Sequence, residues 1–207
     1  MWCLVLGKNN IVIASNNPHK VTEMREILSS YGIEVIVRND LPDVVEDQDT
    51  FEGNAEKKAR EIAVFTGMIS VADDSGLEVD ALNGAPGVFS ARYSGIEKDY
   101  AANNQKLLRE LFNILPEKRT ARFRTVVVLC RPDGTCWRAE GICEGRIIEE
   151  LRGSNGFGYD PLFSVTGSTK TMAEMTSEEK HAVSHRGKAL RELAETVKRN
   201  SEQIFQK

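Results

Sequence analysis

The sequence predicts an α/β fold with a mixed central β-sheet flanked by helices. Near the N-terminus, β-branched runs alternate with helical apolar patterns, which is the order expected of parallel β-α-β units. In the middle of the chain, residues 121–129 have apolar side chains on one face, and Asp133-Gly134 supplies a strong hairpin turn before a returning strand over 135–140. Parallel units followed by an antiparallel hairpin favour a mixed sheet.

A short strand and a capped helix open this fold. The β-branched run 11–15 predicts the strand, and Asn17 followed by Pro18 predicts the N-cap and first residue of the helix. Apolar residues at helical spacing continue to Gly32, where the helix should end, and residues 33–37 form the next strand. This arrangement places a polar turn at the carboxyl end of a strand, a common location for ligand sites.

An acidic connector over residues 39–49 leads to a second helix, with Thr50 as its expected N-cap and Gly67 as its end. Residues 68–72 form a strand that stops at Asp73-Asp74, so at least one carboxylate should project from the carboxyl edge of the sheet. The later elements are extended structure over 77–79, a helix over 99–112, bends or bulges at Gly141 and Gly145, a short helix with a Thr176–Glu179 capping box, and an amphipathic helix through Leu190, Leu193, Ala194 and Val197.

Composition limits the class of protein. The 207 residues include 27 Lys and Arg against 31 Asp and Glu, for a net charge of −4, and 41% are hydrophobic, which is typical of a globular chain with a substantial core. The longest apolar runs have five residues, whereas a membrane-spanning helix needs about 20. Because no secretory signal pattern precedes the first strand, we expect a cytoplasmic protein with no membrane partner. The acidic balance argues against nucleic acid as a ligand but allows a small nucleotide.

The chain contains no linker or repeat, so we expect a single domain over residues 11–207, with residues 1–10 as an N-terminal extension of unknown role. Its four cysteines, Cys3, Cys130, Cys136 and Cys143, form no C-x-x-C pair and have no His at zinc-finger spacing. We therefore expect reduced and mostly buried thiols, because free Cys usually behaves as a small hydrophobe.

Two polar clusters in the first half of the chain could carry chemistry. Residues 15–20 combine a hydroxyl, amides and an ammonium group at the start of a helix, where an anion is favoured; a well-capped helix with a surface lysine is the alternative. Asp73-Asp74-Ser75-Gly76 contains adjacent carboxylates that resist burial together. Mg²⁺ would resolve that conflict, with Glu46 as a second candidate ligand, whereas a solvent-exposed acidic turn would need no metal.

Two further clusters lie in the second half. In residues 156–160, glycines flank Phe157, which offers a stacking face, and Asp160 could accept hydrogen bonds from a base; a tight turn with a core aromatic is the alternative. Lys180 and residues 184–187 provide cations suited to phosphate and a histidine suited to a base edge, although such residues also occur on solvated surfaces. No P-loop, dinucleotide fingerprint or G-x-S-x-G elbow is present, so the clusters together favour phosphate chemistry on a nucleotide.

Six short polar or glycine-containing motifs follow one another along the chain. They are Ala14-Ser-Asn-Asn-Pro-His-Lys20, Thr50-Phe51 with Asn54-Ala55 and Lys58-Ala59, Ala72-Asp-Asp-Ser-Gly-Leu77, Gly84-Ala-Pro-Gly87 with Ser90-Ala-Arg-Tyr-Ser-Gly95, Gly156-Phe-Gly-Tyr-Asp-Pro161, and Glu178-Glu-Lys180 with Ser184-His-Arg-Gly-Lys-Ala189. Over nearly all of residues 11–198, the chain closely resembles the inosine triphosphate pyrophosphatase family of nonstandard purine nucleoside triphosphate pyrophosphatases. Two positions depart from the family pattern: Gly53 stands where relatives often have Glu, and Asn16 where many have Gly.

The resemblance implies a homodimer of two-lobed subunits with the active-site cleft between the lobes, which hydrolyses ITP, dITP and XTP to the monophosphate and pyrophosphate. This reaction would remove deaminated purines from the nucleotide pool. The resemblance also implies Mg²⁺, with Mn²⁺ as an alternative, held by Glu46 and Asp74, and Asp74 as general base. The substrate-binding residues that it implies are Ser15, Asn16, Asn17, Pro18, His19, Lys20, Ser75, Phe157, Gly158, Tyr159, Asp160, Lys180, His185 and Arg186.

Two alternatives remain open on the sequence. One is a pyrophosphatase for other modified nucleotides with a Maf-like fold, and the other is a nucleotide-binding module without turnover.

Overall fold

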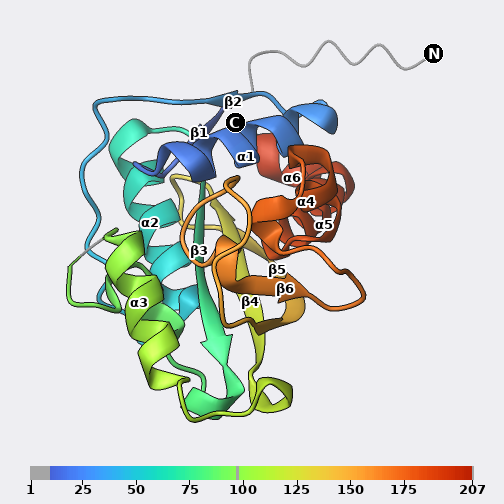
Figure 1. The fold of residues 1–207 in the computed structure, drawn as a ribbon. Coiled ribbons are helices and arrows are strands. Elements are labelled where there is room, and N and C mark those ends of the chain that lie inside the picture. The colour runs from blue at the N-terminus through green and yellow to red at the C-terminus, as the bar shows by residue number, and fades with distance from the viewer. Residues whose placement is uncertain (1–9, 97, 207) are drawn as a thin grey trace.

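A six-stranded mixed sheet forms the centre of the computed structural model, which describes residues 10–96 and 98–206 (Figure 1). Its order is β2-β1-β3-β4-β5-β6; β1 pairs in parallel with β2 and β3, and all other pairs are antiparallel. The strands are β1 (Ile11–Ile13), β2 (Val35–Ile36), β3 (Ser70–Val79), β4 (Thr120–Cys130), β5 (Cys136–Ile147) and β6 (Phe163–Val165). The predicted mixed sheet is confirmed, and all but Asn10 of the expected N-terminal extension lies outside the described residues.

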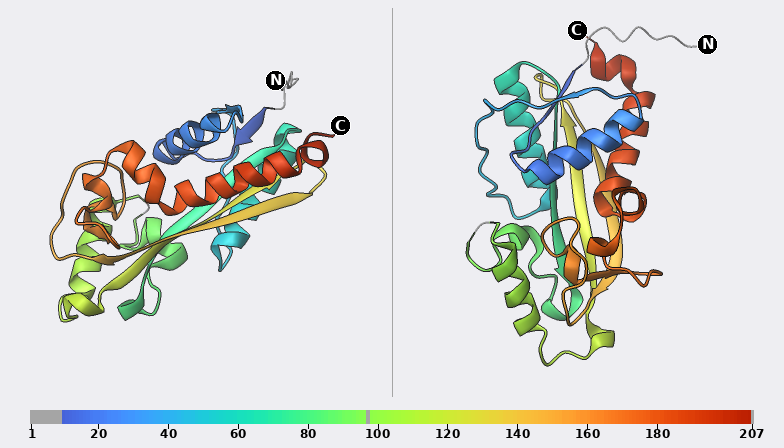
Figure 2. Two further views of the ribbon diagram at one scale, coloured as in Figure 1. Left: turned by 90° about the vertical axis from the view of Figure 1, so that its right-hand side faces the viewer. Right: turned by 45° about the horizontal axis from the view of Figure 1, so that its top comes forward.

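Helices cover both faces of this sheet, as Figure 2 shows. Side chains of α1 and α5 pack with Val71 and Val127 on one face, whereas α2 packs with Ala72 and Val128 on the other. The helices are α1 (Pro18–Ser30), α2 (Phe51–Thr66), α3 (Tyr100–Glu110), α4 (Ser177–Val183), α5 (His185–Arg199) and α6 (Ser201–Phe205). None of the described helices has the length and apolar character needed to cross a membrane.

A third apolar cluster forms at the other end of the long strands. Leu77 of β3 and Phe123 of β4 pack there with Leu107 of α3 and with Phe163 of β6. This cluster is the core of a second lobe, distinct from the lobe that α1, α2 and α5 build around β1. One cleft is lined by residues of both lobes, Ala14 and Ile62 from the first and Phe123 and Tyr159 from the second.

The local helix signals of the sequence are confirmed. Asn17 caps α1 with Pro18 in its first turn, Thr50 caps α2, and Gly67 ends α2 in a left-handed conformation with φ +66°. The predicted capping box of α4 is also present, because Thr176 and Glu179 satisfy each other's backbone N–H groups. These short-range patterns therefore determined where the helices begin and end.

The expected end of the third strand at Ala72 is wrong. β3 continues through Asp73 and Asp74 to Val79, because every residue from Ser70 to Val79 has a partner in β4. Asp, Ser and Gly are poor strand formers, but a complete ladder with a long neighbouring strand overrides that preference. The strand that stops at this level is β1, which pairs with β3 only as far as Val71.

The bends expected at Gly141 and Gly145 are also absent. Both glycines lie in the regular β4–β5 ladder, opposite Thr125 and Ala121. A Cβ atom on Gly141 would lie 2.0 Å from the carbonyl oxygen of His185, so this glycine allows α5 to approach the sheet.

The expectation of reduced cysteines is wrong for one pair, because Cys130 and Cys136 form a disulfide. They are directly opposite each other in the β4–β5 hairpin, with Cα atoms 4.2 Å apart. Cys143 is a buried free thiol as expected, and Cys3 lies outside the described residues.

Candidate functional site

A cleft of about 880 Å³ opens along the edge of β3 that β1 leaves unpaired. After Ala14 donates its backbone N–H to Val71, the chain turns away, and the next bridge to this edge of β3 is made by Pro86 with Glu78. Residues 74–76 of β3 therefore border the cleft. Because alternate residues of a strand point to opposite faces, this open edge brings groups from both faces of the sheet to one site.

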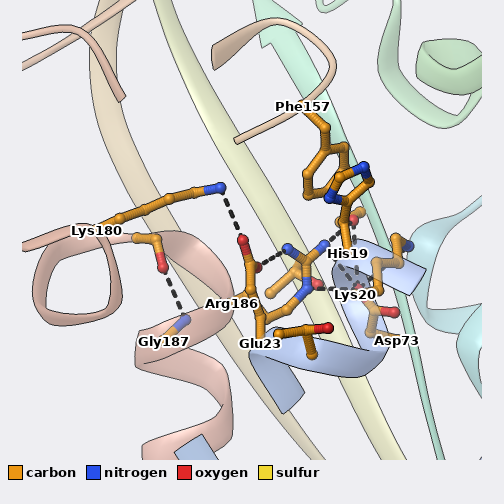
Figure 3. Close-up of polar contacts among 12 residues, drawn as sticks. His19, Lys20, Glu23, Asp73, Phe157, Lys180, Arg186 and Gly187 are labelled. Atoms are coloured by element: carbon orange, nitrogen blue, oxygen red, sulfur yellow. Dashed lines mark hydrogen bonds and ion pairs between the residues drawn. The ribbon is translucent and has the colours of Figure 1, made fainter. Parts of the chain in front are cut away.

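Asp73 points to the face covered by α1 and α5 and is held by two cations (Figure 3). Arg186 donates from Nε and Nη2 to its Oδ2, at 3.1 and 3.0 Å, and Lys20 Nζ lies 3.2 Å from the same oxygen. Burial opposes ionisation of Asp73, but Lys20 and Arg186 outweigh it and hold the pKa of this carboxyl well below its usual range. Asp73 is therefore an ionised anchor for the cations.

Asp74 points to the opposite face, toward α2. Its Oδ2 accepts a hydrogen bond from Asn54 Nδ2 at 3.0 Å, and Lys58 Nζ lies 4.0 Å from its Oδ1. Burial raises the pKa of Asp74 above its ordinary value, even though Lys58 acts in the opposite direction. Adjacent carboxylates thus have opposite pKa shifts, because the strand places them in different environments.

Glu46, in the acidic connector, and Asp74 share one cationic neighbour, Lys58. Lys58 Nζ makes an ion pair with Glu46 and reaches toward Asp74. No cluster of three or more potential metal-ligating residues occurs in the described part of the chain. Two carboxylates around one positive charge nevertheless fit Mg²⁺, which usually takes one or two protein carboxylates together with phosphate oxygens.

Glu23 of α1 joins two of the predicted cations, and sequence reasoning missed it. Its carboxylate accepts hydrogen bonds from Lys180 Nζ at 2.7 Å and from Arg186 Nη1 at 2.5 Å (Figure 3). Burial opposes its ionisation, but Arg186 and Lys180 lower the pKa of Glu23 to about 2. Its spacing of three residues from Lys20 was the available signal, because residues i and i+3 share a helix face.

The loop over residues 153–160 is held by its own polar groups. Asp160 is buried, and its Oδ2 accepts from the backbone N–H of Phe157 and from Lys180 Nζ, each at 2.9 Å. Asn104 of α3 donates to the carbonyl of Gly158 at 3.0 Å, and the Tyr159 hydroxyl donates to the carbonyl of Ser90 at 2.9 Å. This bonding fixes the backbone on both sides of Phe157.

His185 occupies the inner wall of the cleft. Its ring stacks on Phe123 with centroids 4.8 Å apart, and its Nδ1 is buried with no hydrogen-bond partner among the described residues. Burial and the neighbouring Arg186 lower the pKa of His185 well below its ordinary value, so the ring is neutral at physiological pH. A neutral ring with a free nitrogen can donate to or accept from a ligand.

In the loop over residues 15–20, one side chain caps α1 and another places a cation in the cleft. Asn17 Oδ1 accepts from the backbone N–H groups of His19 and Lys20, at 3.0 and 3.4 Å, so the cap already uses these donors. Asn16, the departure from the family pattern, bonds Asp43 of the connector. Lys20 Nζ reaches the cleft and its ion pair with Asp73.

Most of the predicted site residues lie together in the cleft. Pro18 and His19 are not part of its wall, and His19 instead stacks on Phe157. The residues that line it are Ser15, Asn16, Asn17, Lys20, Glu46, Asp74, Ser75, Phe157, Gly158, Tyr159, Asp160, Lys180, His185 and Arg186. Besides Glu23, sequence reasoning assigned no site role to Asn54 and Lys58, although both belong to a motif that it recognised.

This arrangement defines a class of protein: an α/β protein whose cleft offers cations for a polyanion, paired carboxylates for a metal or a proton, and an aromatic ring for a planar group. The chain belongs to the Ham1 family, whose sequence profile matches residues 11–196. The resemblance to the inosine triphosphate pyrophosphatase family is thereby confirmed.

Similar proteins cover almost the whole chain. It is 50% identical over 192 residues to the dITP/XTP pyrophosphatase of Desulforamulus reducens, covering 91% of this chain and 96% of that one. It is 48% identical to the dITP/XTP pyrophosphatase of Clostridium perfringens, covering 90% and 96%. Among solved structures, a HAM1 protein from Coxiella burnetii superposes with a TM-score of 0.83 at 42% identity, covering 92% of this chain and 98% of that one. The Staphylococcus aureus Ham1 protein gives a TM-score of 0.82 at 41% identity, covering 92% and 99%.

Proposed function

We propose that this hydrolase cleaves the nonstandard purine triphosphates ITP, dITP and XTP to the nucleoside monophosphate and pyrophosphate, and so removes deaminated purines from the nucleotide pool. The names and close similarity of the relatives from D. reducens and C. perfringens support the reaction and the substrate class. The observation that carries the proposal is the open edge of β3, where Asp74 on one face and the cation pair around Asp73 on the other border a single cleft.

Mg²⁺ is the proposed metal, held by Glu46 and Asp74, with Mn²⁺ as an alternative. When bound, it would neutralise charge on the phosphate oxygens of the substrate. The support is the pair of carboxylates that already share the positive charge of Lys58.

Asp74 acts as general base and accepts the proton of the attacking water. A buried carboxylate with a raised pKa is a stronger base than an exposed one, which favours this role. Asn54 and the backbone N–H of Ser75 each bond one of its oxygens, at 3.0 and 2.9 Å, and so orient the carboxylate.

Lys20, Lys180 and Arg186 bind the triphosphate and stabilise the negative charge that develops on the pyrophosphate leaving group. Glu23 and Asp73 hold these three cations at fixed positions before substrate arrives. Preorganised charge of this kind costs little reorganisation during the reaction.

Phe157 stacks on the purine, and His185 is positioned to contact a base edge. A pocket that donates to the 6-oxo group of hypoxanthine or xanthine leaves a polar group mispaired with the 6-amino group of ATP, at a cost of about 1–3 kcal/mol.

The test is steady-state pyrophosphate release from ITP, XTP, dGTP, ATP, dTTP and UTP, with Mg²⁺ and with excess EDTA, together with calorimetric binding of the same nucleotides. Metal-dependent turnover of ITP and XTP at least about tenfold above ATP, a difference of about 1.4 kcal/mol, is the expected result. Preferential turnover of dTTP or UTP would instead indicate a Maf-like pyrophosphatase, and binding without turnover would indicate a sensor.

We also propose that the enzyme is a cytoplasmic homodimer that binds neither nucleic acid nor membranes. The net charge of −4 supports the first exclusion, since phosphate-backbone binding normally needs a basic excess. Light scattering coupled to size-exclusion chromatography distinguishes a dimer from the 23.1 kDa monomer.

A further inference from the structure

His19 lies against the ring that is proposed to receive the base. Figure 3 shows its imidazole beside the ring of Phe157. The two rings are stacked, with centroids 5.1 Å apart and an angle of 15° between their planes. His19 is exposed on the first turn of α1, and its imidazole makes no hydrogen bond within the described parts of the chain. The stack on Phe157 is therefore the contact that positions this side chain.

The other groups around Phe157 contact it differently. Tyr100 is tilted by 45° at a centroid distance of 6.0 Å, and the cationic groups of Lys180 and Arg186 lie 5.1 and 5.7 Å from the ring centroid. Among the described residues only His19 adopts the near-parallel geometry that a stacked purine would adopt.

A phosphate-binding role for the His19 side chain is not supported by this geometry. Its backbone N–H is taken by Asn17 Oδ1 at 3.0 Å, and its ring is directed to Phe157 on the base side of the cleft. The sequence placed His19 with the phosphate loop because of its neighbours along the chain, whereas its ring contact places it with the base.

We propose that His19 occupies the stacking face of Phe157 in the free enzyme and is displaced by the purine when nucleotide binds. This inference rests on the proposed function in one respect, namely that Phe157 is the platform for the base. The imidazole thereby reduces the affinity for every ligand that carries a base and leaves the affinity for the phosphate chain unchanged.

The size of the effect follows from a two-state equilibrium. The apparent dissociation constant of a ligand is its intrinsic value divided by the fraction of protein in which the site is open. An aromatic pair of this kind is weak enough that its removal should change affinity by about two- to tenfold. Displacement needs only a side-chain rotation at an exposed position, so it requires no change in the backbone of α1.

Binding of two probes, IMP and inorganic tripolyphosphate, tests the proposal by isothermal titration calorimetry. His19→Ala should bind IMP about two- to tenfold more tightly than the wild type, because it leaves Phe157 open. His19→Phe should have the opposite effect on IMP affinity. Its ring should stack on Phe157 more strongly than the imidazole does and so weaken IMP binding. Tripolyphosphate affinity should be the same for all three proteins, and their circular dichroism spectra should match.

Other results would overturn the proposal. If His19→Ala binds IMP more weakly, the imidazole supports the base instead of competing with it. If IMP affinity does not change, the stack has no role in binding, and if tripolyphosphate affinity falls, His19 belongs to the phosphate site.

A second substitution separates failure of this inference from failure of the proposed function. In the His19→Ala background, Phe157→Ala should weaken IMP binding because the base loses its platform. If IMP binding is not weakened, Phe157 is not the base platform, and both the proposed role of Phe157 and the displacement of His19 are wrong. If IMP binding is weakened, but His19→Ala alone did not increase IMP affinity, only the proposed displacement of His19 is wrong.

Discussion

Glu23 on α1 and Arg186 on α5 form an ion pair across 163 positions of sequence, with Oε2 and Nη1 2.5 Å apart. Glu23 also binds Lys180, which pairs with Asp160 of the loop over residues 153–160. Arg186 also binds Asp73, so the pair connects this loop to β3. A carboxylate that contacts no substrate in the proposed mechanism thus sets the position of two cations that do. We regard Glu23 as a positioning residue.

Glu23→Gln is expected to lower kcat for ITP about tenfold, which corresponds to about 1.4 kcal/mol of transition-state stabilisation. Lys180 and Arg186 lose the charge that orients them, but the site also becomes more positive, so KM should change less than kcat. Steady-state kinetics on ITP measures both constants. Glu26→Gln, one turn along the same helix and exposed, is the control and should match the wild type. A variant in which KM rises and kcat is unchanged would assign Glu23 to binding alone.

The same residue should make stability depend on pH in acid. The pKa of Glu23 is about 2 in the folded protein against 4.5 for the free group, so its ionised form is favoured by folding. This contribution is fully present above pH 4.5 and is lost as the pH falls toward 2. From the pKa difference, the loss is on the order of 3 kcal/mol.

Urea unfolding of the wild type and Glu23→Gln at several pH values measures this contribution. The difference in unfolding free energy between the two proteins should be constant from neutral pH to about pH 5 and should shrink on further acidification. A difference that does not vary with pH would mean that Glu23 ionises equally in the folded and unfolded states.

The features of the fold that could be predicted from the sequence are those set by contacts between residues close together in the chain. Asn17 and Thr50 cap helices through groups within three residues, so their positions could be recognised directly. The course of β3 through Asp73 and Asp74 depends on β4, about fifty residues further along, and local propensity opposes it. The Cys130–Cys136 disulfide was missed for a different reason: the hairpin turn between them was recognised, but its register was not used to pair them.

In the candidate site, too, residues within local motifs could be predicted, whereas a residue defined by distant partners could not. The polar motifs of the sequence contain most residues that line the cleft, because chemistry requires unusual residue types close together. Glu23 could not be distinguished from a solvent-facing residue of an amphipathic helix, since both its partners are more than 150 positions away. Burial of such a charge becomes visible only when the partners are placed in space.

Asp74→Asn should retain nucleotide binding and lower kcat by about 10²–10⁴-fold, the usual contribution of a general base. The amide can still bond Asn54 and Ser75 but cannot accept the proton of water. Calorimetry with IMP and kinetics with ITP separate the two effects. Asp73→Asn is the contrasting variant, because its carboxylate anchors Lys20 and Arg186, and it should weaken tripolyphosphate binding. Unchanged turnover of Asp74→Asn would remove this residue from the catalytic role.

Glu46→Gln should raise the Mg²⁺ concentration needed for half-maximal activity about tenfold or more, because one of two proposed carboxylate ligands is lost. Activity of the wild type should vanish in excess EDTA and return when Mg²⁺ is added. Asp49→Asn removes an equal charge from the exposed end of the same connector and serves as the control. If the two variants have the same Mg²⁺ dependence, Glu46 is not a metal ligand.

Two glycines beside Phe157 provide a matched test of the loop over residues 153–160. Gly156 and Gly158 both have positive φ, +75° and +64°, so alanine strains the backbone at either position. A Cβ on Gly156 would also lie 2.1 Å from Asp160 Oδ2, whereas a Cβ on Gly158 meets nothing within 4 Å. Gly156→Ala must therefore displace Asp160 from the Phe157 N–H and from Lys180, and IMP binding should weaken about tenfold more than in Gly158→Ala, or about 1.4 kcal/mol. Equal affinities in calorimetry would show that backbone strain, and not the contact with Asp160, determines the shape of this loop.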